Sequence, residues 1–303
     1  MLERPFRSLD GWVSYLGRLD LPVLRRTAAA LESLRERADS VSGREIAAVV
    51  LQDPLMTLKV LAYLESHRSP CQNHDVTTIE RALMMLGVER FFRSFPELQS
   101  VETQLEAWPK ALIGVLRVIG RARNASRFAR DWAQLRYDID VDEVTVAALL
   151  YDCLEVALWC SAPSLALAIR REQDEHPGLR SHEAQRLVLG VTLGEIQRAV
   201  ARAWHLPQLL ARLMDDSEAD NPRAQNVVLA VNLARHLANG WEDPAVPDDL
   251  AAVQRLLRIP EETLLARLGA PTLPGPDLPA SAPLNSWPQN SQSACTPPGR
   301  SDG

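Results

Sequence analysis

The sequence lacks the short motifs by which several common enzyme classes are recognised. Its 303 residues include no glycine-rich phosphate-binding loop and no Gly-x-Ser-x-Gly nucleophile elbow. Only four cysteines occur, and no two of them form a Cys-x-x-Cys pair. We therefore expect neither phosphate-loop chemistry nor an elbow serine, and we expect buried, reduced thiols in place of a disulfide framework.

Basic residues are fewer than acidic ones, and nearly all of them are arginine. Lys59 and Lys110 are the only lysines, and 33 basic residues stand against 39 acidic ones, which gives a formal charge of -6. A net acidic chain is unsuited to nucleic acid as its main partner. We attribute the arginine excess to coding preference and assign it no function.

Signals for export and membrane insertion are also missing. The first residues, Met1–Pro5, lack the apolar region of a signal peptide. The longest uncharged stretch that is mainly apolar, Val156–Ile169, is interrupted by Pro163 and falls short of the roughly 20 apolar residues that a membrane helix needs. We therefore expect a cytoplasmic protein that binds neither membranes nor nucleic acid.

The patterns that are present are typical of helices. Hydrophobic residues make up 46% of the chain, enough for a sizeable core, and no long run alternates apolar and polar residues as a strand would. Capping boxes are predicted at Ser42–Glu45, Thr77–Glu80 and Thr192–Glu195, and proline-marked helix starts at Asp20–Pro22, Asp53–Pro54, Pro109 and Asn221–Pro222. The sequence therefore predicts an all-α fold.

Four sequence blocks carry a family resemblance. They are Leu21-Pro22-Val23-Leu24, Gln52-Asp53-Pro54-Leu55 followed by an apolar helix, Thr78–Gly87, and Trp204-His205-Leu206-Pro207. In order, spacing and residue type they resemble the HDOD domain. This is the HD-related output domain of bacterial signalling proteins, a degenerate branch of the HD phosphohydrolase superfamily. The resemblance implies a two-lobed helical fold.

The resemblance also divides the chain. It implies an HDOD domain at 14–240, with an N-terminal lobe at about 14–108 and an HD-like lobe at about 109–240, flanked by extensions at 1–13 and 241–269. Residues 270–303 are rich in proline and serine, and such a segment buries too little apolar surface to offset its ordering entropy. We expect a disordered tail, with a docking peptide around Trp287 as the alternative.

The resemblance further implies where the catalytic centre of an HD enzyme would lie. In those enzymes an apolar helix ends in a His-Asp pair that binds a cation, and the matching segment here, Val144–Glu155, carries Tyr151-Asp152. A tyrosine is a poor ligand at neutral pH because its phenol has a pKa of about 10. The other positions of this vestigial pocket fall at Asn124, Leu193, Asp215 and Asp216. We therefore expect a pseudoenzyme without metal or cofactor.

Two metal-binding alternatives stay open. Asp152, Asp215 and Asp216 offer the oxygen ligands that Mg²⁺ prefers, although carboxylates in such positions commonly have structural roles. His67, Cys71, His74 and Asp75 lie close together in a predicted loop and offer donors for Zn²⁺. Their spacing matches no established zinc motif, so polar loop residues are the simpler interpretation.

Basic residues also follow the predicted helix that begins at Pro109. Arg117 and Arg121 are four residues apart, as are Arg123 and Arg127, which places each pair on one side of a helix. The simpler interpretation is a solvated face that pairs with acids elsewhere. The functional alternative is a binding site for a cyclic nucleotide or an acidic partner, because the guanidinium fork suits phosphate.

Three functional hypotheses follow. The first is a non-catalytic signalling or scaffold module that binds signalling proteins. The second is a sensor that holds a nucleotide or another anion in the vestigial pocket. The third is a weak metal-dependent phosphohydrolase.

Overall fold

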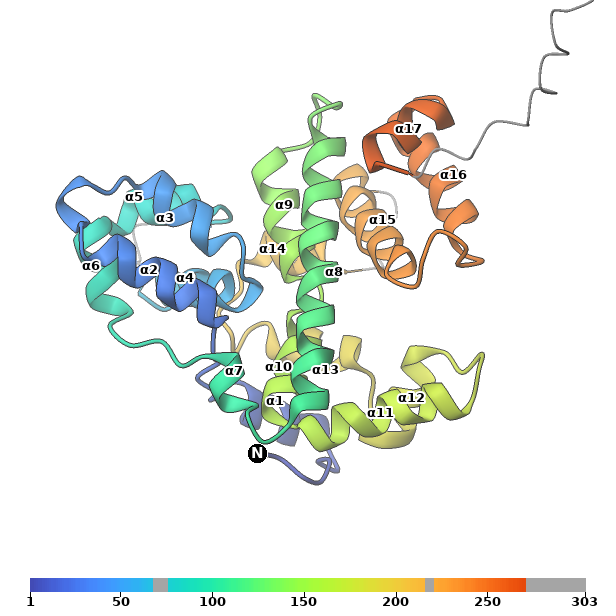
Figure 1. Cartoon of the computed structure of the whole chain (residues 1–303), viewed down its shortest axis with the longest axis horizontal. Helices are drawn as coiled ribbons and strands as arrows, with labels where there is room; N and C mark the ends of the chain where they lie inside the picture. The colour runs from blue at the N-terminus through green and yellow to red at the C-terminus, as the bar shows by residue number, and fades with distance from the viewer. Residues whose placement is uncertain (68–75, 216–220, 271–303) are drawn as a thin grey trace, which may run out of the picture.

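The computed structural model describes residues 1–67, 76–215 and 221–270 (Figure 1). The helices are α1 (Leu9–Leu16), α2 (Arg25–Arg35), the 3-10 helix η1 (Ala38–Ser40), α3 (Gly43–Val50), α4 (Pro54–Ser66), α5 (Ile79–Leu86), α6 (Val88–Ser94), α7 (Val101–Gln104), α8 (Pro109–Ala133), α9 (Val141–Leu150), α10 (Cys153–Ser161), α11 (Pro163–Glu175), α12 (Ser181–Leu189), α13 (Leu193–Val200), α14 (Gln208–Leu213), α15 (Pro222–Leu237), α16 (Val246–Leu257) and α17 (Glu261–Leu268). Within these ranges the sole β-type pairing is an isolated bridge between Val23 and Ser100. The predicted all-α fold is confirmed.

Helix α8 is the central element of the fold. Its 25 residues correspond to about 37 Å of helix. Helices α2 to α6 lie on one side of it and α15 to α17 on the other, while α11 and α12 lie at the end near its N-terminus (Figure 1). Small buried residues, among them Ala122, Ala125 and Ala129, form much of its inner surface against α9 and α15. Gly114 is required by close packing, because a Cβ there would lie 2.6 Å from the Trp159 ring.

The N-terminal lobe is tied together by a buried aspartate. Asp53 is fully buried and caps α4, accepting hydrogen bonds from the backbone N–H groups of Leu55 (3.0 Å) and Met56 (3.3 Å). Its other oxygen accepts from the N–H of Leu24 at 2.7 Å, which fixes the start of α2 against the start of α4. The Asp53-Pro54 block is therefore both a helix cap and a link between helices.

Two predicted helix starts are displaced. Asp20–Pro22 was expected to begin a helix, but α2 begins at Arg25, because Val23 is extended and pairs with Gln99 and Val101 through its backbone. The cap of α5 is Thr78, whose side chain accepts from the N–H of Arg81, and Thr77 precedes it. The capping boxes at Ser42 and Thr192 form as predicted.

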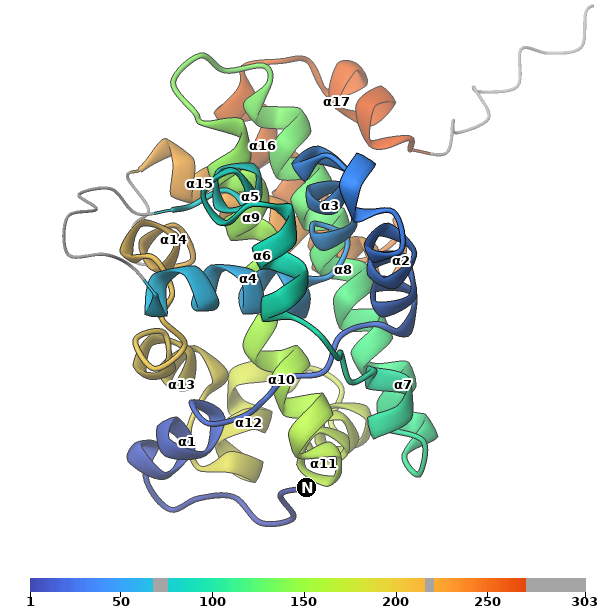
Figure 2. The same cartoon turned by 90° about the vertical axis from the view of Figure 1, so that its left-hand side faces the viewer.

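The N-terminal helix packs on the second half of the chain. Trp204 donates its indole N–H to the carbonyl of Leu16 at 3.0 Å, and the N–H of Leu2 donates to the carbonyl of Ser161 at 2.8 Å. Helix α1 lies beside α13, as Figure 2 shows. The boundary predicted at residue 14 falls inside this helix. The predicted tail lies outside the described residues, apart from Ala270.

Helices α9 and α10 are largely buried in the apolar interior. Tyr151 and Asp152 form the turn between them. Together, residues Val141–Ser161 are long and apolar enough by composition to cross a membrane. This segment contains Asp152 and Glu155, so it is not an uncharged run and was not expected as a membrane helix from the sequence. In the fold 83% of this segment's most apolar window is buried, as expected for a core helix.

Candidate functional site

The site is centred on Asp152, at the turn where α9 gives way to α10. The side chain of this aspartate is 8% exposed and makes no capping hydrogen bond to its own helix. Arg235 on α15 donates to Oδ1 of Asp152 at 2.8 Å. Arg121 on α8 approaches Oδ2 at 3.5 Å. Two guanidinium groups from different helices therefore flank this carboxylate.

Glu155 extends the cluster by one turn of α10. Arg121 donates to its Oε2 at 2.8 Å, so one guanidinium nitrogen contacts two carboxylates. Residues three apart on a helix lie on the same side, which is why Asp152 and Glu155 meet the same arginine. The result is a network of two acids and two arginines that joins α8, α10 and α15.

Charge and burial act in opposite directions on these acids. Burial alone would raise the pKa of Asp152, but the positive charges of Arg235 and then Arg121 outweigh it and hold that pKa below its usual value. Burial raises the pKa of Glu155, because Arg121 compensates it less fully and the neighbouring charge of Asp152 adds to the increase. The pKa of Arg235 is raised, chiefly by the charge of Asp152.

A cavity of about 560 Å³ opens beside this network. Four residues assigned to the vestigial pocket line it, namely Tyr151, Asp152, Leu193 and Asp215. Asn124 does not line it and is exposed on α8. Asp216 lies outside the described residues. The fold therefore brings four of the residues assigned by resemblance, from the ends of α9 and α14 and the start of α13, to one cavity.

Several lining residues were not anticipated from the sequence. They are Glu155, His182, Arg198, Arg212 and Arg235. Glu155 had a detectable signal, because it follows Asp152 by three residues on the same helix. Arg235 had none, because it comes from α15, 83 residues later in the chain.

The residues of the two metal-binding alternatives lie only partly within the described structure. Within the described ranges no group of three or more His, Cys, Asp or Glu side chains lies close enough to hold a metal ion. Asp152 and Asp215 line the same cavity, but Asp152 directs both oxygens at arginines. His67 ends α4, with its ring stacked on Tyr63 at 4.2 Å. Its proposed zinc partners, Cys71, His74 and Asp75, lie outside the described residues.

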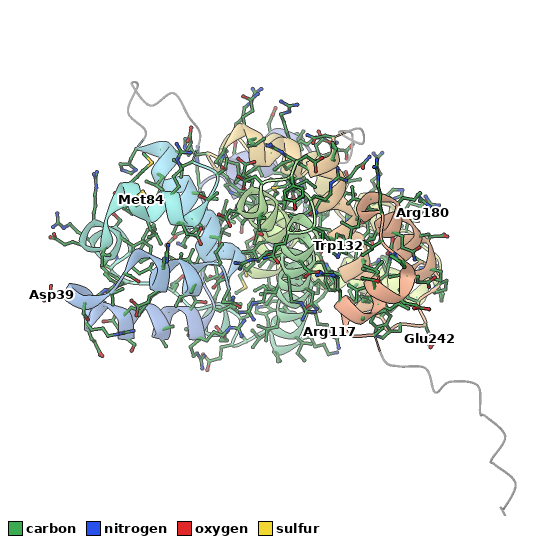
Figure 3. All side chains as sticks on the ribbon, turned by 90° about the horizontal axis from the view of Figure 1, so that it is seen from above. Asp39, Met84, Arg117, Trp132, Arg180 and Glu242 are labelled. Atoms are coloured by element: carbon green, nitrogen blue, oxygen red, sulfur yellow. The ribbon has the colours of Figure 1, made fainter. Side chains whose placement is uncertain are left out.

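The arginines of α8 do not converge on one anion site. Arg121 turns toward Asp152 and Glu155, whereas Arg123 donates to the carbonyl of Gln52 at 2.6 Å. Arg121 and Arg123 are two positions apart, which corresponds to about 200° of rotation on a helix. The pair Arg117 and Arg121 therefore faces a different side from the pair Arg123 and Arg127. Arg127 lies over the Phe128 ring at 5.3 Å, and Arg117 is exposed on the outer surface (Figure 3). Of these four, Arg121 alone is in the Asp152 network.

Comparisons with known proteins agree with this architecture. The family model of the HDOD domain matches residues 21–219. The structure is similar to that of the MmoQ response regulator of Methylococcus capsulatus, with 20% identity, a TM-score of 0.60, and coverage of 79% of this chain and 98% of that one. It is also similar to a virulence factor of Campylobacter jejuni, with 17% identity, a TM-score of 0.58, and coverage of 86% and 95%. Among curated proteins, none matches the sequence.

Proposed function

The chain belongs to the HDOD domain family, and we propose that it is a non-catalytic signal-transduction or scaffold module that acts by binding signalling proteins. Membership in this family supports a signalling-related role for the chain. The finer statement, that the chain binds partners and does not turn over a substrate, rests on the chemistry of its central site.

The observation that carries the proposal is the engagement of Asp152 by Arg235 and Arg121. A hydrolytic metal centre needs carboxylate or imidazole ligands whose lone pairs are available to a cation. Here both oxygens of the buried acid face guanidinium groups, and Tyr151 stands beside it in place of an imidazole. A cation entering this site would have to displace two arginines from Asp152. Arg235 would then lose its acid partner and Arg121 would keep only Glu155, which is costly for partly buried charges.

The outer face of α8 offers a surface on which partner binding can be tested. Ile113 is 53% exposed and Leu116 is 42% exposed, and their spacing of three residues puts them on one side of the helix. Exposed apolar side chains on a rigid helix are common in protein interfaces. Arg117 and Asn124 continue the same face.

The test combines capture with an activity screen. Cross-linking capture with the intact chain should recover the same signalling protein reproducibly, and the double variant Ile113→Glu with Leu116→Glu should lose it. Leu187→Glu, on α12, is the matched control because Leu187 is also exposed (67%) but lies on another helix. A phosphodiester or phosphomonoester turnover that requires Mg²⁺ or Mn²⁺ and vanishes in Asp152→Asn would overturn the non-catalytic assignment.

A second candidate function is supported by the cavity beside Asp152. Arg198, Arg212 and Arg235 contribute guanidinium groups to its wall, and its volume of about 560 Å³ is that of a ligand pocket. A nucleotide or another anion bound there would make the chain a sensor that shifts between conformational states. Nucleotides and cyclic dinucleotides should then raise the melting temperature of the wild type but not that of Arg198→Gln. No rise at saturating concentration would remove this candidate.

A further inference from the structure

A second cavity lies between α15 and α16, and it shares one lining residue, Asp215, with the cavity beside Asp152. Its volume is about 580 Å³. Both of these helices begin after residue 219, where the match to the family model ends. They pack side by side on the flank of α8 opposite the N-terminal lobe (Figure 1). The cavity is therefore built largely from a part of this chain that the family match does not cover.

Part of the wall of this cavity is aliphatic, and the rest is polar, with Asp215, Gln225 and three arginines among the lining residues. Val228 and Leu229 contribute from α15, and Ala252 and Leu256 contribute from α16. In each helix the contributing positions are adjacent or four apart, so each helix presents one apolar strip to the cavity. No aromatic side chain lines it. Such a wall suits a saturated chain better than a nucleobase, which binds best by stacking.

Three arginines line the same cavity. Arg136 is held in place by Asp138 and by the carbonyl of Leu256, to which it donates at 2.8 Å. The side chains of Arg255 and Arg258 make no hydrogen bond or ion pair with any residue that the structure describes, although the backbone N–H of Arg258 donates to the carbonyl of Gln254 at 2.7 Å. Two exposed guanidinium groups thus lie beside the aliphatic part of the cavity with their donors available.

The backbone of Arg258 strengthens this assignment. It ends α16 in the left-handed region, with φ of 56° and ψ of 42°, where glycine is the usual residue. Helix C-termini favour a cation, but Arg255 already supplies one in the last turn of α16. A glycine would close the helix without strain, so the end of the helix alone does not account for an arginine at this position.

We propose that this cavity binds a small aliphatic anion, with the hydrocarbon against Val228, Leu229 and Leu256 and the charged group at Arg255 and Arg258. The charged group is a carboxylate or a phosphate, since guanidinium donors suit both. The site shares Asp215 with the pocket beside Asp152 but contains neither Asp152 nor Arg235, and it does not depend on the function proposed for the chain.

The first experiment is calorimetric titration of the full chain with octanoate, octyl phosphate, 1-octanol and inorganic phosphate. Octanoate and octyl phosphate should bind, and whichever binds tighter identifies the charged group. Because 1-octanol lacks the charge, it should bind at least about 10-fold more weakly than octanoate. Because inorganic phosphate lacks the hydrocarbon chain, it should bind at least about 10-fold more weakly than octyl phosphate. In the series hexanoate, octanoate, decanoate, affinity should rise about fourfold per added methylene.

Variants then locate the binding. Arg255→Gln with Arg258→Gln should weaken octanoate binding by about 10-fold or more, since both charged hydrogen bonds are lost. The control is Arg26→Gln with Arg44→Gln, two exposed arginines of the N-terminal lobe, which changes the net charge equally and should leave binding unchanged. Ala252→Leu should also block binding by filling the cavity, provided that its melting temperature shows it to be folded.

The outcomes against the proposal are equally specific. Failure of both octanoate and octyl phosphate to bind at millimolar concentration would overturn it. Equal affinity for phosphate and octyl phosphate would show that the arginines bind anions at the surface and that the cavity does not bind the hydrocarbon chain, which would overturn the proposal. Binding that survives both the double arginine variant and Ala252→Leu would place the ligand elsewhere on the chain.

Discussion

Arg235 and Asp152 form an ion pair at 2.8 Å although they are 83 positions apart in sequence. The acid is 8% exposed, whereas the arginine is 40% exposed, so the pair lies at the wall of a cavity with its negative partner inside. A fixed guanidinium therefore supplies the positive charge that this buried carboxylate requires. Loss of the arginine would leave the acid dependent on Arg121 alone.

The first prediction follows from that dependence. Arg235→Met should lower the free energy of unfolding by about 2 to 3 kcal/mol, which is less than the roughly 3 to 5 kcal/mol for breaking a fully buried ion pair, because Arg235 itself is partly exposed. Urea unfolding measures the change. Arg117→Met, on the exposed face of α8, is the control and should change stability by less than about 0.5 kcal/mol. The double variant Arg235→Met with Asp152→Leu should recover most of the loss.

The second prediction concerns pH. The pKa of Asp152 is lowered from 3.8 by Arg235 and Arg121, so its ionised form stabilises the fold above that value. This contribution is lost as pH falls from 3.8 through the lower folded-state pKa. The stability difference between wild type and Asp152→Asn should therefore be largest near neutral pH and should shrink on acidification. A difference that grows on acidification would mean that the pKa of Asp152 is raised.

Much of the fold could be predicted from the sequence because helix ends are local. Caps such as Ser42 and Thr192 and the proline at Pro109 act within one turn, and all three appear as expected. The start of α2 could not be placed in this way. It depends on the pairing of Val23 with the segment around Ser100, which lies 77 positions away.

The candidate site likewise contains some residues that local sequence patterns predict and others that only the packing of distant helices brings together. Tyr151 and Asp152 could be assigned because the apolar helix before them is a local pattern. The role of Arg121 was only one of several possibilities, since a periodic row of arginines does not show which side faces an acid. Arg235 could not be found, because its contact with Asp152 exists only after α15 packs against α8 and α9.

The third prediction compares two aspartate caps. Asp53 is buried, caps α4 and also accepts from the N–H of Leu24, so Asp53→Ala removes a cap and leaves buried N–H groups without acceptors. We expect a loss of about 2 to 4 kcal/mol. Asp140→Ala removes the exposed cap of α9 and should cost about 1 kcal/mol, because water replaces the lost acceptor. Chemical denaturation of both variants tests the difference, and equal losses would contradict the linking role of Asp53.

The fourth prediction concerns the end of α16. Arg258 has φ of 56°, a conformation that costs an L-residue about 1 to 2 kcal/mol, whereas glycine adopts it freely but loses more entropy on folding. Arg258→Gly should therefore leave stability unchanged or raise it by about 0.5 to 1 kcal/mol. Arg255→Gly, three residues earlier inside the helix, removes the same charge and should cost about 1 kcal/mol. Thermal unfolding without ligand compares the two. A loss in Arg258→Gly as large as that in Arg255→Gly would show that the left-handed arginine carries no strain, and its presence beside the α15–α16 cavity would then need no functional explanation.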